Sequence, residues 1–141
     1  ELRRAFIELS EDGSNAGLVT TFLSFGYKHG IPLESDLLFD VRFLPNPYFE
    51  PELRKLTGSD PAVISYLEKL KPAKKFLIKT SELLQFLIPQ YALEGKRYLT
   101  IGVGCTGGRH RSVFIAEKLL HCVTGIRGVR FRFKHRDISR S

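Results

Sequence analysis

Apolar residues gather in short runs along the 141-residue chain, and polar segments separate these runs. Residues 18–25 and 37–43 are rich in β-branched and aromatic side chains, which predicts a strand in each. Residues 98–103 are apolar enough for a central strand, and residues 129–133 alternate apolar with basic side chains. We therefore expect four strands.

Helical spacing of apolar residues occurs between these strands. Asp60 and Pro61 supply a helix cap and a first-turn proline, and apolar residues then recur at helical spacing up to position 70. A second helix carries the apolar residues of 76–88 and is expected to bend or end at Pro89, with Gly95 as its stop signal. A third helix covers residues 113–123. Strands separated by helices predict a layered α/β domain with a mixed or parallel sheet.

Residues 44–51 follow the second predicted strand and contain three prolines. This content excludes both a helix interior and a central strand, so the segment is either an ordered functional loop or a flexible one. Asn46 and Tyr48 are candidates to cover a ligand, and packing of Tyr48 in the core is the alternative.

The segment at 104–112 reads Gly-Cys-Thr-Gly-Gly-Arg-His-Arg-Ser and joins the third strand to the third helix. A strand, a glycine turn and a helix in this order place backbone N–H groups and a helix N-terminus around one concavity, which suits a phosphate group. Arginine adds side-chain donors that bind phosphate oxygens in pairs. A tight turn with solvated arginines is the alternative. The predicted ligand-binding residues of this loop are Cys105, Thr106, Gly107, Gly108, His110, Arg111 and Ser112.

The same loop also satisfies the C-x5-R spacing of cysteine-dependent phosphatases, with Cys105 as nucleophile and Arg111 as phosphate ligand. The histidine that usually precedes the cysteine is Gly104 here, and no aspartate can be assigned as general acid. Catalysis by Cys105 and Arg111 is therefore the alternative to a site without enzyme activity. A cysteine that only fills the start of the loop is equally compatible with the sequence.

Four residues outside the loop are further candidates. Asp40 and Arg42 are two apart in the predicted second strand and would share one face. They form either a local ion pair or part of the site, where Arg42 binds the anion and Asp40 accepts hydrogen bonds from the ligand. Lys28 and His29 lie in a glycine-flanked turn and either line the site or sit on the surface.

Composition narrows the class of protein. With 43% hydrophobic and 26% charged residues, the chain fits one globular domain, and no apolar stretch is long enough to span a membrane. The N-terminus lacks the pattern of a secretory signal, so we expect a soluble cytoplasmic domain. The two cysteines have no metal-binding spacing, and we expect neither a metal nor a cofactor in this domain.

Positive charge is concentrated at the C-terminal end. Six Lys or Arg and one acid lie in residues 127–141, a local excess of five within a net charge of +7. Alternate basic residues on a strand would lie roughly 6.6 Å apart on one face, a spacing that suits the phosphates of an extended nucleic acid. A charged edge strand that resists aggregation is the alternative. The predicted RNA-binding residues are Arg127, Arg130, Arg132, Lys134, Arg136 and Arg140.

Three motifs together resemble the C-terminal domain of RapZ-type RNase adapter proteins: FGYKHGIP at 25–32, FDVRFLPNP at 39–47 and GCTGGRHRSV at 104–113. The resemblance implies a phosphofructokinase-like α/β half-domain that senses glucosamine-6-phosphate and binds small regulatory RNAs. It further implies a homo-oligomer that presents RNA to an endoribonuclease and so regulates amino-sugar synthesis. Residues 18–141 would be this domain, and residues 1–17 the linker remnant of a missing N-terminal domain that binds ATP or GTP.

The resemblance also assigns ligand contacts. It places the sugar phosphate against Asp40, Thr106, Gly107, His110 and Arg111, with His29, Arg42 and Cys105 close by. Enterobacterial members tend to have histidine at the position of Tyr48, which is tied to ligand and RNA binding. Their tail ends in a run of Lys and Arg, whereas the basic residues here alternate with Val129, Phe131 and Phe133.

Overall fold

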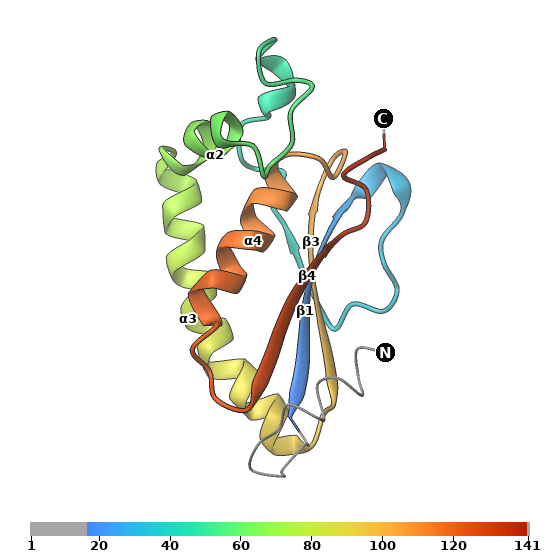
Figure 1. Ribbon diagram of the computed structural model, residues 1–141, viewed down its shortest axis with the longest axis vertical. Helices are drawn as coiled ribbons and strands as arrows, with labels where there is room; N and C mark the ends of the chain where they lie inside the picture. The colour runs from blue at the N-terminus through green and yellow to red at the C-terminus, as the bar shows by residue number, and fades with distance from the viewer. Residues whose placement is uncertain (1–16, 141) are drawn as a thin grey trace.

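The computed structural model describes residues 17–140 as a four-stranded parallel sheet with three α-helices along one face (Figure 1). The strand order is β2-β3-β1-β4. The strands are β1 (Leu18–Gly26), β2 (Leu37–Asp40), β3 (Tyr98–Cys105) and β4 (Val129–His135), and the helices are α2 (Pro61–Glu68), α3 (Lys71–Glu94) and α4 (Arg111–Val123). The predicted layered α/β architecture is confirmed, and all strand pairs are parallel. The predicted linker remnant lies outside the described residues apart from Gly17.

The core lies between the sheet and the helices. Leu18 and Phe22 are four residues apart on β1, so both face the helical layer, where they are fully buried together with Leu119 of α4. Helix α4 packs on β1, β3 and β4, and α3 packs on the outer side of α4. Every residue of β1 is buried, as expected for a central strand of a parallel sheet.

One sequence expectation needs correction, and the structure decides one alternative that the sequence left open. Strand β2 ends at Asp40, so Arg42 lies in the turn that follows and not in the strand, because the chain bends there toward the first proline at position 45. Helix α3 does not end at Pro89 but continues to Glu94. Its buried residues Leu84 and Ile88 hold this part of the helix against the core, and the helix ends at Gly95 in a left-handed conformation with φ of 96°.

The carboxyl ends of β1 and β3 define the upper edge of the sheet in Figure 1. The chain leaves β1 through a short 3-10 helix, η1 (Tyr27–His29), on the face without α-helices, whereas β3 continues through the glycine loop into α4 on the opposite face. Neighbouring strands that leave a parallel sheet toward opposite faces open a crevice at their carboxyl ends. The crevice therefore lies beside residues 104–112.

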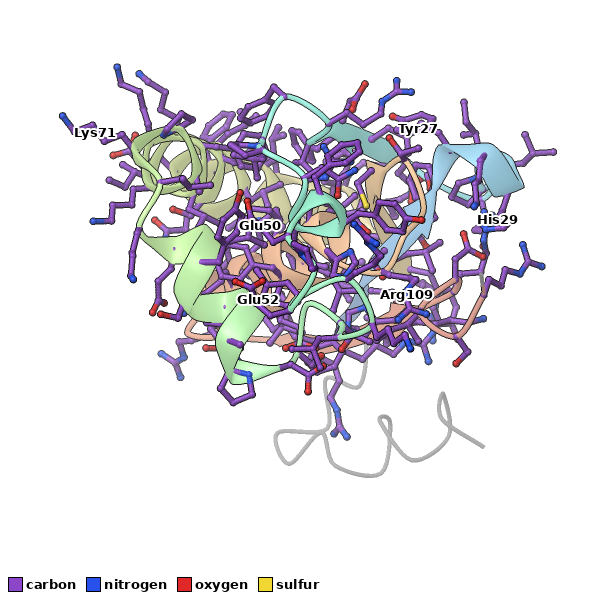
Figure 2. All side chains as sticks on the ribbon, turned by 90° about the horizontal axis from the view of Figure 1, so that it is seen from above. Tyr27, His29, Glu50, Glu52, Lys71 and Arg109 are labelled. Carbon is purple, nitrogen blue, oxygen red and sulfur yellow. The ribbon has the colours of Figure 1, made fainter. Side chains whose placement is uncertain are left out.

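The proline-rich segment is ordered above this crevice. It contains a 3-10 helix, η2 (Pro47–Phe49), in which the side chain of Asn46 accepts a hydrogen bond from the Tyr48 N–H at 3.0 Å. Figure 2 shows the same end of the molecule from above, where Arg109 lies between η1 and the segment that carries Glu50 and Glu52. Among residues 17–140, no helix combines the length and hydropathy that a membrane crossing requires.

Candidate functional site

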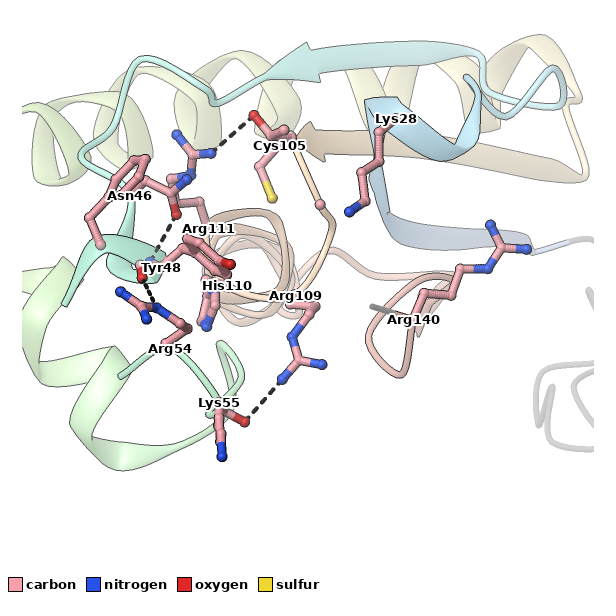
Figure 3. A pocket seen from close by; sticks show the side chains of 13 residues that line it. Lys28, Asn46, Tyr48, Arg54, Lys55, Cys105, Arg109, His110, Arg111 and Arg140 are labelled. Atoms are coloured by element: carbon pink, nitrogen blue, oxygen red, sulfur yellow. Dashed lines mark hydrogen bonds between the residues drawn. The ribbon is translucent and has the colours of Figure 1, made fainter. Parts of the chain in front are cut away.

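A pocket of about 520 Å³ opens at the carboxyl edge of the sheet (Figure 3). The glycine loop, the turn after β1, the proline-rich segment, residues 54–55 and the C-terminal segment all contribute to it. Its lining residues are Lys28, Asn46, Tyr48, Phe49, Arg54, Lys55, Cys105, Thr106, Gly107, Arg109, His110, Arg111 and Arg140. Six of these are Lys or Arg and none is Asp or Glu, so the pocket carries a strongly positive potential that attracts anions.

The glycine loop is held by its carbonyl groups. The Thr106 carbonyl accepts from the Lys28 N–H at 3.2 Å, and the Arg109 carbonyl accepts from the Gly58 N–H at 2.8 Å. Within residues 17–140, the N–H groups of Gly107, Arg109 and His110 have no hydrogen-bond acceptor. The loop thus has unpaired backbone N–H groups next to the N-terminus of α4. This is the arrangement that binds phosphate oxygens.

Gly108 is the tightest point of the loop. Its φ of +83° lies in the left-handed region, and a Cβ there would lie 2.6 Å from the Gly26 nitrogen and 2.9 Å from Cβ of Asp137. Only glycine permits both the conformation and this approach to the end of β1. The loop therefore depends on Gly108 for its shape. A Cβ at Gly107, in contrast, would meet no atom within 4 Å, so this residue is free to face the pocket.

Cys105 is 2% exposed and points its sulfur toward the pocket in Figure 3. Its Sγ accepts from the Gly108 N–H at 3.3 Å, and the thiol donates to Oγ of Ser112 at 3.2 Å. These are the neighbours that the C-x5-R hypothesis expects around the sulfur. No carboxylate lines the pocket within the described chain to act as a general acid.

Arg111 ties α4 to the proline-rich segment. It is 4% exposed, and its Nη1 donates to the carbonyls of Arg42 at 3.0 Å and Leu44 at 2.9 Å. Burial lowers the pKa of Arg111. The buried Nε has no hydrogen-bond acceptor in the part of the chain that the structure describes.

His110 lines the pocket with an uncharged imidazole ring. Its Nε2 donates to the Leu53 carbonyl at 3.2 Å, which fixes the proton on Nε2 and leaves Nδ1 as an acceptor. Burial lowers the pKa of His110 below its usual value, so the ring is uncharged at neutral pH.

Asp137 joins the C-terminal segment to the end of β1. Its carboxylate is fully buried, accepts hydrogen bonds from the Gly26 N–H at 2.8 Å and from Arg136 at 2.9 Å, and forms an ion pair with Arg140 at 3.2 Å. Burial alone would raise the pKa of Asp137, but the hydrogen bonds from Arg136 and Gly26 outweigh it and keep the pKa below the ordinary value.

Asp40 and Arg42 form a local ion pair at 2.7 Å, which is one of the two alternatives that the sequence allowed. The Arg42 guanidinium also lies 3.9 Å from the centre of the Tyr27 ring, and its hydrogen bonds lower the pKa of Asp40. Neither residue lines the pocket, and the same is true of His29, Gly108 and Ser112. The loop residues Cys105, Thr106, Gly107, His110 and Arg111 do line it, as does Tyr48.

The predicted RNA-binding residues lie before, on and beyond β4. Arg130, Arg132 and Lys134 alternate along β4, and Arg132 donates to Thr21 Oγ1 at 2.7 Å, which places these residues on the sheet face away from the α-helices. Arg127 is exposed in the turn before β4. Arg136 and Arg140 lie beyond β4 and pair with Asp137, and Arg140 also lines the pocket.

No sequence motif predicted that three of the lining residues belong to the site, namely Phe49, Arg54 and Lys55. Arg54 donates to the Tyr48 carbonyl at 2.8 Å and its guanidinium lies 4.9 Å from the centre of the Tyr48 ring. Arg109 donates to the Lys55 carbonyl at 3.0 Å. These contacts bring the segment at 54–55 to the pocket from about 50 residues away in sequence, a closeness that no local motif reveals.

Comparison with known proteins gives a consistent result. A family profile described as the RapZ C-terminal domain matches residues 18–139. A nucleotide-binding protein of Acidobacterium capsulatum is 49% identical over 139 residues, which are 97% of this chain and 45% of that protein. A nucleotide-binding protein of Sorangium cellulosum is 54% identical over 86% of this chain and 34% of its own length. A nucleotide-binding protein of Rubrobacter xylanophilus is 56% identical over 84% of this chain and 39% of its own length. The chain thus spans a third to a half of these curated relatives.

We predict that Gly108→Ala lowers the free energy of unfolding by about 2–3 kcal/mol, because it forces a side chain into a left-handed conformation against Gly26. Gly107→Ala is the matched control and should change stability by less than about 0.5 kcal/mol, because open space surrounds its position. Urea unfolding followed by circular dichroism measures both. Equal losses in the two variants would contradict the assigned loop shape.

We also predict that Asp137 makes the protein sensitive to acid. Because its pKa is lower in the folded than in the unfolded state, its contribution is present above the unfolded value of about 3.9 and is lost as pH falls through the folded value. Asp137→Asn should cost about 2 kcal/mol at neutral pH and flatten the loss of stability below pH of about 4. Thermal melts of both proteins across this range measure the difference, and parallel pH profiles would rule the role out.

Proposed function

The chain belongs to the family of the RapZ C-terminal domain, and on this premise we propose that it is a binding module that holds a phosphorylated sugar in the pocket and contacts RNA with β4. The single observation that carries the proposal is the glycine loop, with its unpaired N–H groups, inside a pocket lined by six Lys or Arg. We further propose the finer role that the family resemblance implies, in which the ligand is glucosamine-6-phosphate.

The phosphate would lie at the loop. The N–H groups of Gly107 and Arg109 and the Nε of Arg111 are donors without acceptors in the described chain, and an anionic oxygen supplies what they lack. Figure 3 shows the Lys28 side chain directed into the same space from the opposite wall. Charge-assisted hydrogen bonds of this kind are the strongest contacts available to a phosphate.

The sugar would lie against the aromatic part of the pocket. Tyr48 and Phe49 are exposed at 52% and 71% and pack edge to face with ring centres 5.8 Å apart. Exposed aromatic rings at a pocket mouth offer apolar area to the C–H face of a pyranose, while Asn46 and His110 Nδ1 supply polar groups for hydroxyls.

The RNA contact rests on the edge strand β4. Arg130, Arg132 and Lys134 lie on one face, and their charge suits contacts with the phosphate backbone and not with bases. In the longer relatives we propose that such a module acts in the cytoplasm as part of an oligomeric RNase adapter that works with an endoribonuclease to regulate amino-sugar synthesis. The nucleotide-binding activity of their names would then belong to the part that this chain does not cover.

We favour binding over catalysis. The surroundings of Cys105 suit a phosphatase nucleophile, but departure of an alcohol from a phosphate ester needs a proton, and the lining residues include no carboxylic acid. His110 cannot serve readily, because its Nε2 proton is committed to the Leu53 carbonyl. Phosphatase activity therefore lacks a partner for the cysteine among the described residues.

We predict that titration calorimetry detects binding of glucosamine-6-phosphate, and that Lys28→Ala weakens it about tenfold or more, because the variant removes a charged contact with the phosphate. Lys28 is exposed, and no side-chain contact of its own supports the fold among the described residues. Lys79→Ala, an exposed lysine on α3, is the control and should bind like the parent. The absence of heat from the parent protein would end the proposal, as would equal affinity of the two variants.

We predict that Lys134→Gln weakens RNA binding uniformly across RNA sequences. Loss of one phosphate contact should reduce the slope of log affinity against log salt concentration by about one. Lys134 is exposed on β4, so the substitution leaves the core intact. Filter binding at several salt concentrations measures the slope, with Lys79→Gln as the control. An unchanged slope would place the RNA contact elsewhere.

A further inference from the structure

A patch of exposed apolar side chains lies outside the pocket, where α3 packs beside the edge strand β2. Phe76, Leu83 and Phe86 follow one another on α3 at intervals of seven and three residues, so they share one face of the helix. The Phe43 ring, in the turn after β2, has its centre 5.6 Å from that of Phe76. Phe43, Leu83 and Phe86 are exposed at 54%, 46% and 62%. These four residues form the α3 patch, and large apolar side chains gathered on one exposed face mark a surface for a partner.

Exposed lysines border the α3 patch. Residues 69–79 contain five of them, and none forms an ion pair within residues 17–140: Lys69, Lys71, Lys74, Lys75 and Lys79. Lys79 lies three residues after Phe76 and four before Leu83, which places it on the face of the patch itself. Lys75 and Lys71 precede it by about one and two helical turns. Lys71, Lys75 and Lys79 therefore form a row of unpaired cations beside the patch.

The lysine row does not stabilise the helix that carries it. Lys71, Lys75 and Lys79 are spaced four residues apart, and like charges at this spacing repel one another. The row begins at the first residue of α3, whose first turn contains no acid, so the helix dipole adds to the repulsion at Lys71. Acidic residues would be favoured there if helix stability alone mattered. A partner with carboxylates turns this repulsion into attraction, so the charge of the surface indicates an acidic occupant.

From this arrangement we propose that the α3 patch and its lysine row dock an acidic amphipathic helix of a protein partner. Apolar side chains of the partner cover Phe43, Leu83 and Phe86, and its carboxylates meet the lysines. Residues 71–86 extend over roughly 22 Å at 1.5 Å per residue, which matches about four turns of a partner helix. Figure 2 shows Lys71 at the opposite side of the molecule from His29, away from the pocket residue Arg109. The inference is therefore independent of the ligand of the pocket.

Two other occupants agree less well with this surface. A second copy of the chain would bring the same lysines, and the exposed acids of α3 that could oppose them are only Glu82 and Glu94. For RNA, the row contains no arginine, which is the residue that binds phosphate oxygens in pairs. Phosphate contacts would also leave the aliphatic side chain of Leu83 uncovered. An acidic helix with an apolar side satisfies both the charge and the apolar area.

Fluorescence anisotropy with a labelled synthetic peptide tests the proposal. The peptide forms an amphipathic helix of about four turns, with leucine along one side and glutamate beside it. It should bind the chain, and versions with glutamine for glutamate or alanine for leucine should bind about tenfold more weakly. Three exposed ion pairs together are worth about that factor, and so is one buried apolar side chain. Absence of binding, or equal binding of the glutamine version, would overturn the proposal.

Variants of the chain locate the peptide. Lys71→Gln/Lys75→Gln/Lys79→Gln should weaken binding about tenfold without lowering the melting temperature, because the variant removes like-charge repulsion within α3. Phe86→Ser should also weaken binding about tenfold, and its side chain is exposed, so thermal melts should show an intact fold. Undiminished peptide affinity in either variant would refute the assigned surface.

Lys28→Gln/Lys55→Gln/Lys134→Gln is the matched control, because it removes the same charge from three exposed positions elsewhere. This control should bind the peptide like the parent, and equal losses in the two triple variants would reduce the effect to net charge. An RNA oligonucleotide or phosphatidylserine vesicles that bind the parent but not the α3 triple variant would assign the surface to another occupant and overturn the proposal. Dimer formation in light scattering that Phe86→Ser abolishes would do the same. Binding of glucosamine-6-phosphate should be unchanged in the α3 triple variant, so the proposed function stands or fails separately.

Discussion

The contact between the end of β1 and the glycine loop is the constraint on which the site depends. Gly26 and Gly108 approach so closely that neither tolerates a side chain, and the Gly26 N–H donates to the buried carboxylate of Asp137. A buried carboxylate is costly unless it is paired, and Arg136 and Arg140 supply the pairing. Part of the positive C-terminal segment therefore serves to hold the glycine loop in shape beside the pocket.

The second feature of the site is the distribution of positive charge around the pocket. Arg111 is buried at the start of α4, where its guanidinium satisfies carbonyls of the segment at 42–44 and not a carboxylate. Like charges gathered around one pocket repel one another and weaken the folded state, so such a cluster persists where an anion neutralises it. Outside the pocket, Lys96 pairs with Asp36 and Lys118 with Glu68, so the charge of these cations is already balanced by an acid.

Local chemistry made much of this structure predictable. Apolar patterns predicted all four strands and the helices, and the order of strand, glycine turn and helix predicted the loop that lines the pocket, because each of these depends on neighbouring residues. The rest depends on contacts across the fold. In the sequence, Arg54 and Lys55 resemble ordinary solvated residues, and only the hydrogen bond from Arg109 to the Lys55 carbonyl places their segment at the pocket. Arg140 lines the pocket because its ion pair with Asp137 holds the C-terminal segment there. The sequence left open whether α3 bends or ends at Pro89, and packing of Leu84 and Ile88 against the core accompanies its continuation to Glu94.

The loop also shows how one backbone arrangement can serve either binding or catalysis. Donors around Cys105 and next to α4 stabilise negative charge, whether it belongs to a bound phosphate or to a transition state. Catalysis demands more, namely a group that delivers a proton to the leaving oxygen at the right moment. In this pocket the remaining positions hold cations, Asn46, two aromatic rings and a histidine whose proton is committed. Such a lining suits the ground-state binding of an anion, which is the role that we propose for the pocket.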